Sequence, residues 1–385
     1  MTLNGGRVVI IGGGIIGSSI AYHLSEKGYR DVMIIEKDLV GEGATAYATG
    51  GIRQQFSSRV NVEIAQQSFN FWKSFEQRTG SPLDFRQHGY LFLISDEDTA
   101  RVFEKNTVLQ RSLGVDVETL DPSQIAAIFP GVRTDDLVSA TYTPQDGSAS
   151  PADAVAGYLR VARRNGVRVK QHTGFLGLIT GPDGSVCGVQ TSAGDIQAEK
   201  VVVAAGPQSR MVGQLCGLDL PIFPHSRQAF ATAPIDAING SLPLTVDMAT
   251  GAYLHPERSG AAVVGGNDRD VPSTLQASVD WDRVDGLASA LSHRFPRLGE
   301  LKVVRGWAGL REMTPDDHAI VSAVNSVDGL WIAAGFSGHG FMQSPAIGHA
   351  VSQQLLEGYS DLDLSPLRFS RFAEQVEGEL ENAVF

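Results

Sequence analysis

The chain has 385 residues, more than one compact core usually holds, so a typical size of roughly 150 residues per domain predicts two domains. Its hydrophobic share of 42% and charged share of 19% are those of a globular protein and exclude disordered and fibrous classes. The 31 basic and 43 acidic side chains leave a net charge of −12, and no run of the sequence is strongly basic. Nucleic acid and anionic membrane surfaces are therefore not expected partners.

Cysteine content and hydropathy narrow the class further. The chain has two cysteines, Cys187 and Cys216, too few for a disulfide framework, a cysteine-rich zinc site or an iron–sulfur cluster held by this chain alone. No run approaches the roughly 20 apolar residues needed to cross a bilayer, and the opening segment lacks the features of a secretory signal peptide. These patterns predict a cytoplasmic protein without a membrane span or a metal site.

The first thirty residues carry a glycine pattern between a strand and a helix. A β-branched run at 7–11 predicts a strand, and the pattern over 15–27 predicts a helix. Between and within them lie Gly12, Gly14 and Gly17, in the G-x-G-x-x-G spacing. In that spacing the first glycine permits a sharp turn, the second admits a pyrophosphate and the third lets helix and strand pack closely. Phosphates would bind at the helix N-terminus, where free N–H groups and the helix dipole favour negative charge.

A second predicted strand and the acidic residue after it favour a dinucleotide-binding site over a turn that is only rich in glycine. It is predicted at 31–35 and is followed by Glu36, about 20 residues past the last glycine, where an acidic side chain accepts hydrogen bonds from the ribose hydroxyls of an adenosine half. The same carboxylate would repel the 2′-phosphate of NADP. The pattern therefore predicts binding of FAD or NAD.

The next segment favours a flavin. Residues 41–53 are mostly small and suit neither a substrate-recognising helix nor a third strand, but they suit the passage of the chain under a flat ring. Arg53 at the end of this loop is a candidate for contact with the electron-rich end of a flavin or with the anion of a substrate. A surface ion pair is the alternative interpretation of this arginine.

The middle and the end of the chain complete the pattern. Residues 167–205 predict a β-meander followed by a buried parallel strand. Further on, 330–334 predict another strand, and the glycine-rich segment 335–342 leads into a helix predicted from about 345 to 356. A second helix N-terminus would then point at the cofactor and stabilise negative charge on it.

Several segments, taken together and in order, indicate a family. They are the opening glycine motif, the loop that ends in Gly50-Gly51-Ile52-Arg53, the segment Pro144-Gln145-Asp146-Gly147 before a helix, Ala204-Ala205-Gly206-Pro207, Trp307 to Asp316, and Gly335 to Met342. This set resembles the D-amino acid oxidase superfamily over essentially the whole chain. Within it the resemblance is strongest to the branch of glycine and sarcosine oxidases, including the β-subunits of related dehydrogenases.

The resemblance implies FAD and an α/β fold in two domains. The FAD domain is of the two-dinucleotide-binding type and is discontinuous, at 1–80, 145–215 and 315–385. The substrate domain is α+β, with an antiparallel sheet and helices that come from two inserted segments, 81–144 and 216–314.

The resemblance also implies which residues contact FAD. They comprise Gly12, Gly14, Ile16, Gly17, Glu36, Lys37, Ala44, Thr45, Gly50, Gly51, Ile52, Phe175, Ala205, Gly206, Arg311, Gly335, Gly338, His339, Gly340, Phe341 and Met342. In monomeric sarcosine oxidases a cysteine before Thr-Pro-Asp attaches the flavin covalently, and the aligned position here is Gly309. Both cysteines lie elsewhere, so the resemblance implies non-covalent FAD.

The chemistry of such relatives points to an arginine. They oxidise a C–N bond by moving a hydride equivalent to flavin N5, so the site must hold the substrate in a reactive geometry and exclude water. In the resembling glycine and D-amino acid oxidases an arginine of a Gly-Leu-Arg segment clamps the substrate carboxylate, and Arg311 matches it. Structural pairing with Glu312 or Asp316 is the alternative. The lysine that shares this work in monomeric sarcosine oxidases is Met342 here, which strengthens the prediction for Arg311.

Two further residues are catalytic candidates. Tyr253 lies on a predicted hairpin that resembles the one lining the glycine oxidase pocket, so its hydroxyl is expected to reach a substrate carboxylate; a half-buried strand tyrosine is the alternative. His339 lies in the late glycine turn, where a pKa near neutrality would let it influence flavin N1 or the proton of the amine. Backbone contacts of the turn alone are the alternative to that role.

The resulting hypothesis is FAD-dependent oxidation of glycine or an N-substituted glycine to glyoxylate and an amine, with O2 or another electron acceptor. Sarcosine, longer N-carboxymethyl compounds, proline-like imino acids and D-amino acids stay open as substrates. The alternatives are the β-subunit of a multi-subunit sarcosine or proline-type dehydrogenase, which would need a partner subunit, a D-amino acid oxidase, and a flavin-binding subunit without catalysis. An NAD-dependent dehydrogenase would not need a second glycine-rich turn. The sequence leaves a homo-oligomer open.

Overall fold

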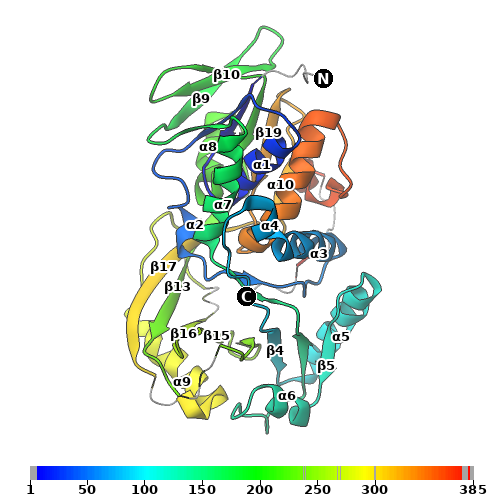
Figure 1. The fold of residues 1–385 in the computed structure, drawn as a ribbon, viewed down its shortest axis with the longest axis vertical. Coiled ribbons are helices and arrows are strands. Elements are labelled where there is room, and N and C mark those ends of the chain that lie inside the picture. Colours follow the sequence, from blue (N-terminus) through cyan, green and yellow to red (C-terminus); the bar gives the residue numbers. More distant parts are fainter. Residues whose placement is uncertain are drawn as a thin grey trace.

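The computed structural model describes residues 7–236, 238, 240–266, 268, 270–298, 301–374 and 380–381. These residues form two units that follow one another along the long axis of the molecule, each built on its own large sheet (Figure 1). The upper unit contains the first strand and the last long helix, and the lower unit is made of two segments from the middle of the chain.

A six-stranded sheet forms the centre of the upper unit. Its strands in spatial order are β18 (Ile320–Ala323), β19 (Leu330–Ala334), β12 (Lys200–Val203), β1 (Val8–Ile11), β2 (Val32–Ile35) and β8 (Arg168–Lys170). All neighbours are parallel except β18, which is an antiparallel edge strand. Short runs of Val and Ile form these strands because both faces of the sheet are covered, and every residue of β1 and β2 is buried.

Helices cover one face of this sheet and a meander covers the other. The helices are α1 (Ile15–Glu26), α3 (Arg59–Lys73), α7 (Pro151–Arg164) and α10 (Gly340–Glu357). The opposite face packs against α8 (Ser209–Leu215) and a meander of β9 (Phe175–Thr180), β10 (Val186–Thr191) and β11 (Ile196–Gln197). At the contact of α10 with α1, Gly348 permits the close approach, because a Cβ there would lie 2.2 Å from Ser19 Oγ.

An eight-stranded sheet forms the lower unit. Its strands in spatial order are β17 (Val303–Met313), β13 (Phe223–Thr232), β16 (Ala262–Gly265), β15 (Tyr253–Pro256), β14 (Leu244–Asp247), β4 (Tyr90–Ile94), β6 (Ser139–Thr143) and β5 (Glu118–Leu120). The fold is therefore the expected mixed α/β type with two sheets. The second sheet is antiparallel except for the pair of β14 and β4, where the two inserted segments join. The residue limits of the two domains stay a prediction.

The two faces of the eight-stranded sheet have different neighbours. One face packs against α6 (Pro122–Ile128) and α9 (Val284–Arg294) in an apolar core of its own. On the other face, α5 (Glu97–Ser112) packs with Phe103 against Phe92 of β4. The remainder of that second face borders a cavity shared with the upper unit. Because side chains alternate between faces, every second residue of a strand is directed to this side.

The last long helix begins earlier than expected. The sequence predicts its start at about Pro345, because proline favours the first turn, whereas α10 begins at Gly340 and contains Pro345 in its interior. A proline there removes one helical hydrogen bond. Side chains of other helices bind the carbonyls just before it: Trp72 Nε1 donates to the oxygen of Met342 at 3.0 Å and Ser19 Oγ to that of Ser344 at 2.7 Å. Contacts from α3 and α1 therefore stabilise the early start of α10, which the proline in its first turns disfavours.

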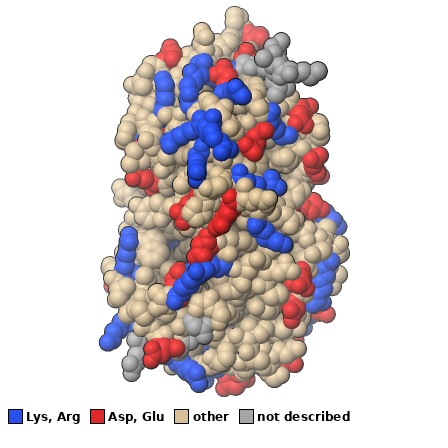
Figure 2. All heavy atoms as spheres, in the orientation of Figure 1, with Lys and Arg blue, Asp and Glu red and all other residues tan. Residues whose placement is uncertain are grey.

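The surface carries charges of both signs. Figure 2 shows Lys and Arg side chains gathered on the part of this face that belongs to the upper unit, with Asp and Glu side chains beside them. In that unit Arg7 and Arg168 both pair with Asp31, at 3.0 and 2.8 Å. Within the described ranges no helix is long and apolar enough to cross a membrane, and no cluster of His, Cys, Asp or Glu suits a metal ion. The expectations on nucleic acid, membrane and compartment stay predictions.

Candidate functional site

A cavity of about 550 Å³ lies where the two units meet. In the upper unit it is lined by Gly12 and Glu36, which follow the carboxyl ends of β1 and β2. In the lower unit it is lined by Tyr253 and Arg311 of the eight-stranded sheet. The carboxyl ends of parallel strands are the usual place for a ligand in such sheets.

The first glycine turn has no room for side chains. Gly12 has a φ of +111°, and a Cβ there would lie 2.2 Å from the carbonyl oxygen of Ala204 in β12's continuation. A Cβ at Gly17 would lie 2.0 Å from the oxygen of Gly12. Gly14 has an ordinary φ of −75° and lines the cavity at the N-terminus of α1. Gly12 and Gly17 are thus required by the protein's own packing, whereas a Cβ at Gly14 would lie 3.3 Å from Thr45 Oγ1.

Glu36 holds this turn in place. Its Oε2 accepts a hydrogen bond from the N–H of Gly13 at 2.8 Å, and its Oε1 accepts one from the N–H of Asp38 at 3.0 Å. Lys37 lies beside it in the lining and pairs with Asp38 at 3.1 Å. The carboxylate is therefore fixed at the edge of the cavity, and each of its oxygens keeps a lone pair that can accept a further hydrogen bond.

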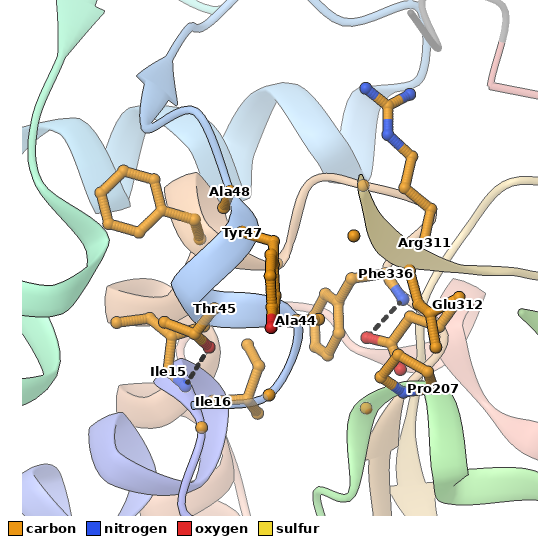
Figure 3. Close-up of a pocket in the computed structure, with 18 of the residues that line it drawn as sticks. Ile15, Ile16, Ala44, Thr45, Tyr47, Ala48, Pro207, Arg311, Glu312 and Phe336 are labelled. Carbon is orange, nitrogen blue, oxygen red and sulfur yellow. Dashed lines mark hydrogen bonds between the residues drawn. The ribbon is translucent and has the colours of Figure 1, made fainter. Parts of the chain in front are cut away.

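The loop of small residues contains a short helix that was not expected. In α2 (Ala44–Tyr47) the hydroxyl of Thr45 accepts from the N–H of Ile15 at 3.1 Å, which ties the loop to the N-terminus of α1 (Figure 3). On the other side Trp307 Nε1 donates to the carbonyl of Tyr47 at 3.1 Å. A Cβ at Gly309 would lie 2.6 Å from Tyr47 Cβ. The loop is therefore held between the first glycine turn and β17.

The second glycine turn brings another helix N-terminus to the cavity. Gly335 and Gly338 have φ values of +75° and +91°, which end β19 and direct the chain into α10. The first residues of α10 line the cavity; they are Gly340, Phe341 and Met342. The first N–H groups of a helix have no partner within it and carry partial positive charge, so the N-termini of α1 and α10 both bring such groups to the cavity.

The eight-stranded sheet directs polar side chains into the same cavity. Register pairs Tyr90 with Leu244, Val246 with Tyr253, and Tyr253 with Gly265. Residues that face each other across a ladder share a side of the sheet, so Tyr90 and Tyr253 point the same way. Gly265 makes room for the second ring, because a Cβ there would lie 2.5 Å from the Tyr253 hydroxyl. Burial raises the pKa of Tyr253 to about 12, so it stays a hydroxyl that donates hydrogen bonds.

Arg311 lies on the same side of the sheet. It is paired in register with His225 of β13, two positions from the pair of Arg227 and Gly309, and it lines the cavity. The Arg311 side chain passes close to Gly338. A Cβ added at Gly338 would lie 3.0 Å from Arg311 Cδ and Nε. In Figure 3 the Arg311 guanidinium points away from Glu312, and Asp316 binds Arg371 at 2.7 Å. Glu312 and Asp316, the two acids considered as structural partners of Arg311, therefore have other contacts.

Arg53 and His339 form a buried pair in the lining. Arg53 Nη2 lies 3.1 Å from His339 Nε2, and because a guanidinium can only donate, Nε2 accepts. Arg53 also donates to the carbonyl of Gln55 and lies 4.2 Å from the centre of the Phe56 ring. Burial and the positive charges of Arg53 and Arg311 lower the pKa of His339 well below its usual value. This differs from the expected pKa near neutrality: His339 is a neutral acceptor at pH 7.

Glu312 is a site residue that the sequence did not single out. Its Oε1 accepts from the N–H of Phe336 at 3.3 Å (Figure 3), and it lines the cavity. Burial raises the pKa of Glu312 to about 7. Its Oε2 is buried and has no hydrogen-bond partner within the described part of the chain. The alternation of a strand could have indicated that Glu312 and Arg311 point to opposite sides.

The expected and observed linings differ at several positions. Four residues of the expected set lie outside the lining: Gly17, Ile52, Phe175 and Gly335. Phe175 begins β9 and packs in the apolar core behind the parallel sheet, because the meander lies on the far face. Lining residues that the sequence did not indicate include Tyr47, Tyr90, His172, Gln208, Arg227, Gln228 and Glu312.

The sequence model of the family described as FAD dependent oxidoreductase (DAO) matches residues 7–354. The chain belongs to this family. It is 29% identical to rat (Rattus norvegicus) mitochondrial dimethylglycine dehydrogenase over 96% of its own length, but spans 45% of that protein. Its structure resembles L-proline dehydrogenase from P. horikoshii, with a TM-score of 0.91, 30% identity and coverage of 97% and 98% of the two chains. Glycine oxidase from Geobacillus kaustophilus has a TM-score of 0.84, 25% identity and coverage of 95% and 98%.

The cavity of this FAD-dependent oxidoreductase, an enzyme of amino acids or amines, fits FAD. The glycine turn at Gly12 and Gly14 presents backbone and the N-terminus of α1, which suit a pyrophosphate. The orphan Oε2 of Glu312 suits a hydroxyl of the cofactor, because a buried acceptor needs a donor. The N-terminus of α10 suits the anionic side of a reduced flavin. These contacts to FAD stay predictions for each residue.

Proposed function

We propose that this chain oxidises the C–N bond of glycine or of an N-substituted glycine. FAD, when bound, supplies the acceptor of the hydride at its N5. The carbon beside nitrogen loses the hydride and the nitrogen loses a proton, so that an imine forms, and water hydrolyses it to glyoxylate and an amine. The electrons then pass to O2 or to another acceptor.

The observation that carries the proposal is the position of Arg311. It lines the cavity that both glycine turns border, and it lies on the same side of the sheet as Tyr253. A guanidinium binds both oxygens of a carboxylate, and a neutral tyrosine hydroxyl donates a further hydrogen bond. The arrangement would hold an amino-acid carboxylate and leave the neighbouring C–H toward the cofactor.

The charges of the cavity suit an uncharged amine. Hydride leaves only from the neutral amine, and nearby positive charge lowers the pKa of an ammonium group. Arg53 and Arg311 both act on His339 in this way, and a substrate nitrogen beside them experiences the same field. The site therefore favours the reactive form of the substrate without a protein base at the carbon.

The proposal includes non-covalent FAD. Cys187 is exposed and Cys216 follows α8, and the described lining of the cavity contains neither. Gly309 occupies the strand position beside Tyr47. Release of the flavin by acid or heat denaturation, leaving a colourless polypeptide, is the expected result.

A visible spectrum of the purified protein under anaerobic conditions tests the proposal. Glycine, sarcosine, longer N-carboxymethyl amines, proline and D-alanine are added in turn, and bleaching of the flavin band by N-substituted glycines is expected. Readmitted air separates oxidase from dehydrogenase by the rate at which colour returns. A yellow protein that none of these amines bleaches contradicts the proposal and favours a flavin-binding subunit without catalysis.

One second candidate has an observation in its favour. The TM-score of 0.91 to an L-proline dehydrogenase supports oxidation of a cyclic imino acid with electrons passed to a partner instead of O2. In the same experiment this candidate predicts bleaching by proline and slow return of colour in air.

A further inference from the structure

Glu381 is a buried carboxylate that binds the start of α3, although it lies 324 positions after Ser57 in the sequence. The residue is 1% exposed. Its Oε1 accepts hydrogen bonds from the N–H of Ser57 at 2.8 Å and from the hydroxyl of Ser57 at 2.7 Å. Its Oε2 accepts from the N–H and the hydroxyl of Ser58 at 3.2 and 2.9 Å, and from Asn61 Nδ2 at 2.8 Å. An ionised carboxylate can only accept hydrogen bonds, so these donors match its charged form.

The same residue is also bound to the segment that follows β17. The N–H of Glu381 donates to the carbonyl of Asp316 at 3.3 Å, and the side chain of Asp316 binds Arg371 at 2.7 Å. His318 Nε2 lies 3.0 Å from Ser58 Oγ, the hydroxyl that also contacts Glu381. Glu381 therefore connects the start of α3 with the segment after β17.

Arg53 lies in the loop just before the donors that bind Glu381. It lines the cavity, where its Nη2 is 3.1 Å from His339 Nε2. Burial lowers the pKa of Arg53, whereas Tyr90, Glu381 and Asp146 act on it in the opposite direction. The cation at the cavity is therefore accompanied by acidic groups of the chain itself.

The two acids near Arg53 differ in how firmly they hold a negative charge. Asp146 accepts from the N–H and the side-chain amide of Gln54, each at 2.9 Å, but burial raises the pKa of Asp146 to about 7. Glu381 has a larger set of donors, and hydrogen bonds to a carboxylate favour its charged form. Because a buried cation is costly without an anion, Glu381 is the residue best suited to offset the charge of Arg53.

We propose that Glu381 is a positioning residue of the FAD site, which fixes the loop that carries Arg53 and offsets the charge of this arginine at the border of the cavity. The inference needs FAD in the cavity but no particular amine, so it goes beyond the proposed function. Reduction adds negative charge to a flavin, and Arg53 would attract that charge more strongly without Glu381. Glu381 therefore helps to set how readily the bound flavin is reduced.

The test is the midpoint potential of the flavin in the holoenzyme, measured by reductive titration against a reference dye. Glu381→Gln removes the charge with little change of shape. It should favour the reduced over the oxidised flavin by about three- to tenfold, an upward shift of about 15 to 30 mV for a two-electron couple. Glu381→Asp keeps the charge and should restore most of the wild-type potential.

Two matched variants separate the charge of Glu381 from its contacts with α3. Ser57→Ala removes one hydrogen bond to Glu381 but leaves the charge, so it should lower the urea midpoint of unfolding and leave the potential unchanged. Glu374→Gln replaces an exposed acid that pairs with Arg368 and should change neither quantity. If Glu381→Gln shifts the potential no more than Ser57→Ala does, Glu381 only stabilises α3 and the inference is wrong.

A double-mutant cycle tests the link between Glu381 and Arg53 even if Glu381→Gln loses FAD. Urea unfolding of the whole chain is compared for Arg53→Gln, Glu381→Gln and the double variant. Each single variant leaves the other charge buried without its counterpart. The loss in the folding equilibrium constant caused by Glu381→Gln should therefore be at least about fivefold smaller in the Arg53→Gln background. Equal losses in both backgrounds contradict the inference.

The outcomes separate this inference from the proposed function. A raised potential in Glu381→Gln, with a flavin that no amine bleaches, supports the inference and contradicts the proposed function. Bleaching by N-substituted glycines, with an unchanged potential in Glu381→Gln, supports the proposed function and contradicts the inference. A wild-type chain that binds no FAD contradicts both.

Discussion

The two glycine turns and the polar face of the eight-stranded sheet border the same cavity but are built in different ways. The first turn is local: Gly12, Gly14, Gly17 and Glu36 lie within one strand–helix–strand unit, and backbone N–H groups provide its contacts. The polar face combines residues from β4, β15 and β17 with Arg53, which are far apart in sequence. The comparison teaches that the proposed cofactor site depends on backbone space and the proposed substrate site on side chains.

The difference also shows in what glycine does. At Gly12 the chain itself leaves no space, since a Cβ would overlap a carbonyl of the neighbouring strand. At Gly265, on the polar face of the sheet, a Cβ would meet the side chain of Tyr253. Substitution in the first region should therefore remove cofactor, and substitution in the second should change the use of substrate while cofactor stays bound.

The largest expected effect is in the first turn. Gly14→Val should give a folded but colourless protein, because the branched side chain would fill the space that a pyrophosphate needs. Absorbance at the flavin band per polypeptide measures it. Gly286→Ala in α9, where a Cβ has open space, is the matched control and should stay yellow with slightly higher stability, by up to about 1 kcal/mol. A Gly14→Val protein that purifies yellow would contradict the phosphate assignment.

A smaller effect is expected at Arg311. Arg311→Lys replaces a planar fork by a point charge, so KM for carboxylated amines should rise by about 10- to 100-fold while FAD stays bound. Steady-state kinetics on a substrate found in the anaerobic spectrum measure KM and kcat separately. Unchanged KM and kcat with retained FAD would show that Arg311 does not bind the substrate carboxylate.

Gly265→Ala tests the packing of Tyr253. The added methyl group would lie 2.5 Å from the Tyr253 hydroxyl, so the ring must move, and we expect KM to rise by about tenfold, or about 1.4 kcal/mol. The same substitution in a Tyr253→Phe background should cost less, because the displaced hydroxyl is already gone. An equal rise in KM in the two backgrounds would show that the effect of Gly265→Ala does not depend on the Tyr253 hydroxyl.

The smallest effect concerns pH and Glu312. Burial raises its pKa in the folded chain to about 7 from 4.5, so folding favours the protonated form. Stability from this group is full below about pH 4.5 and falls as pH rises through about 7, by less than about 1.4 kcal/mol per pH unit. Glu312→Gln should flatten this slope in urea unfolding of the FAD-free protein between pH 5 and 8. An unchanged slope would assign the pH dependence to another group, with Asp146 the next candidate.

Prediction from sequence succeeded where neighbours in the chain are also neighbours in space. The strand, turn and helix around Gly12, the hairpin of Tyr253 and the strand at 330–334 all have short-range patterns that match the structure. It did not anticipate the start of α10, where Trp72 and Ser19 bind the carbonyls before Pro345, or the packing of Phe175 against the core behind the sheet. In both cases contacts between distant segments decided the outcome.

The sequence by itself determined the mixed α/β class, the family resemblance and the glycine turn, because φ angles, spacing and β-branched runs are properties of short segments. Only the tertiary structure decided which side chains share the cavity. It placed Arg53 against His339 and kept that histidine neutral. Burial and electrostatic coupling set these properties, and both depend on residues that the chain brings together only when it folds.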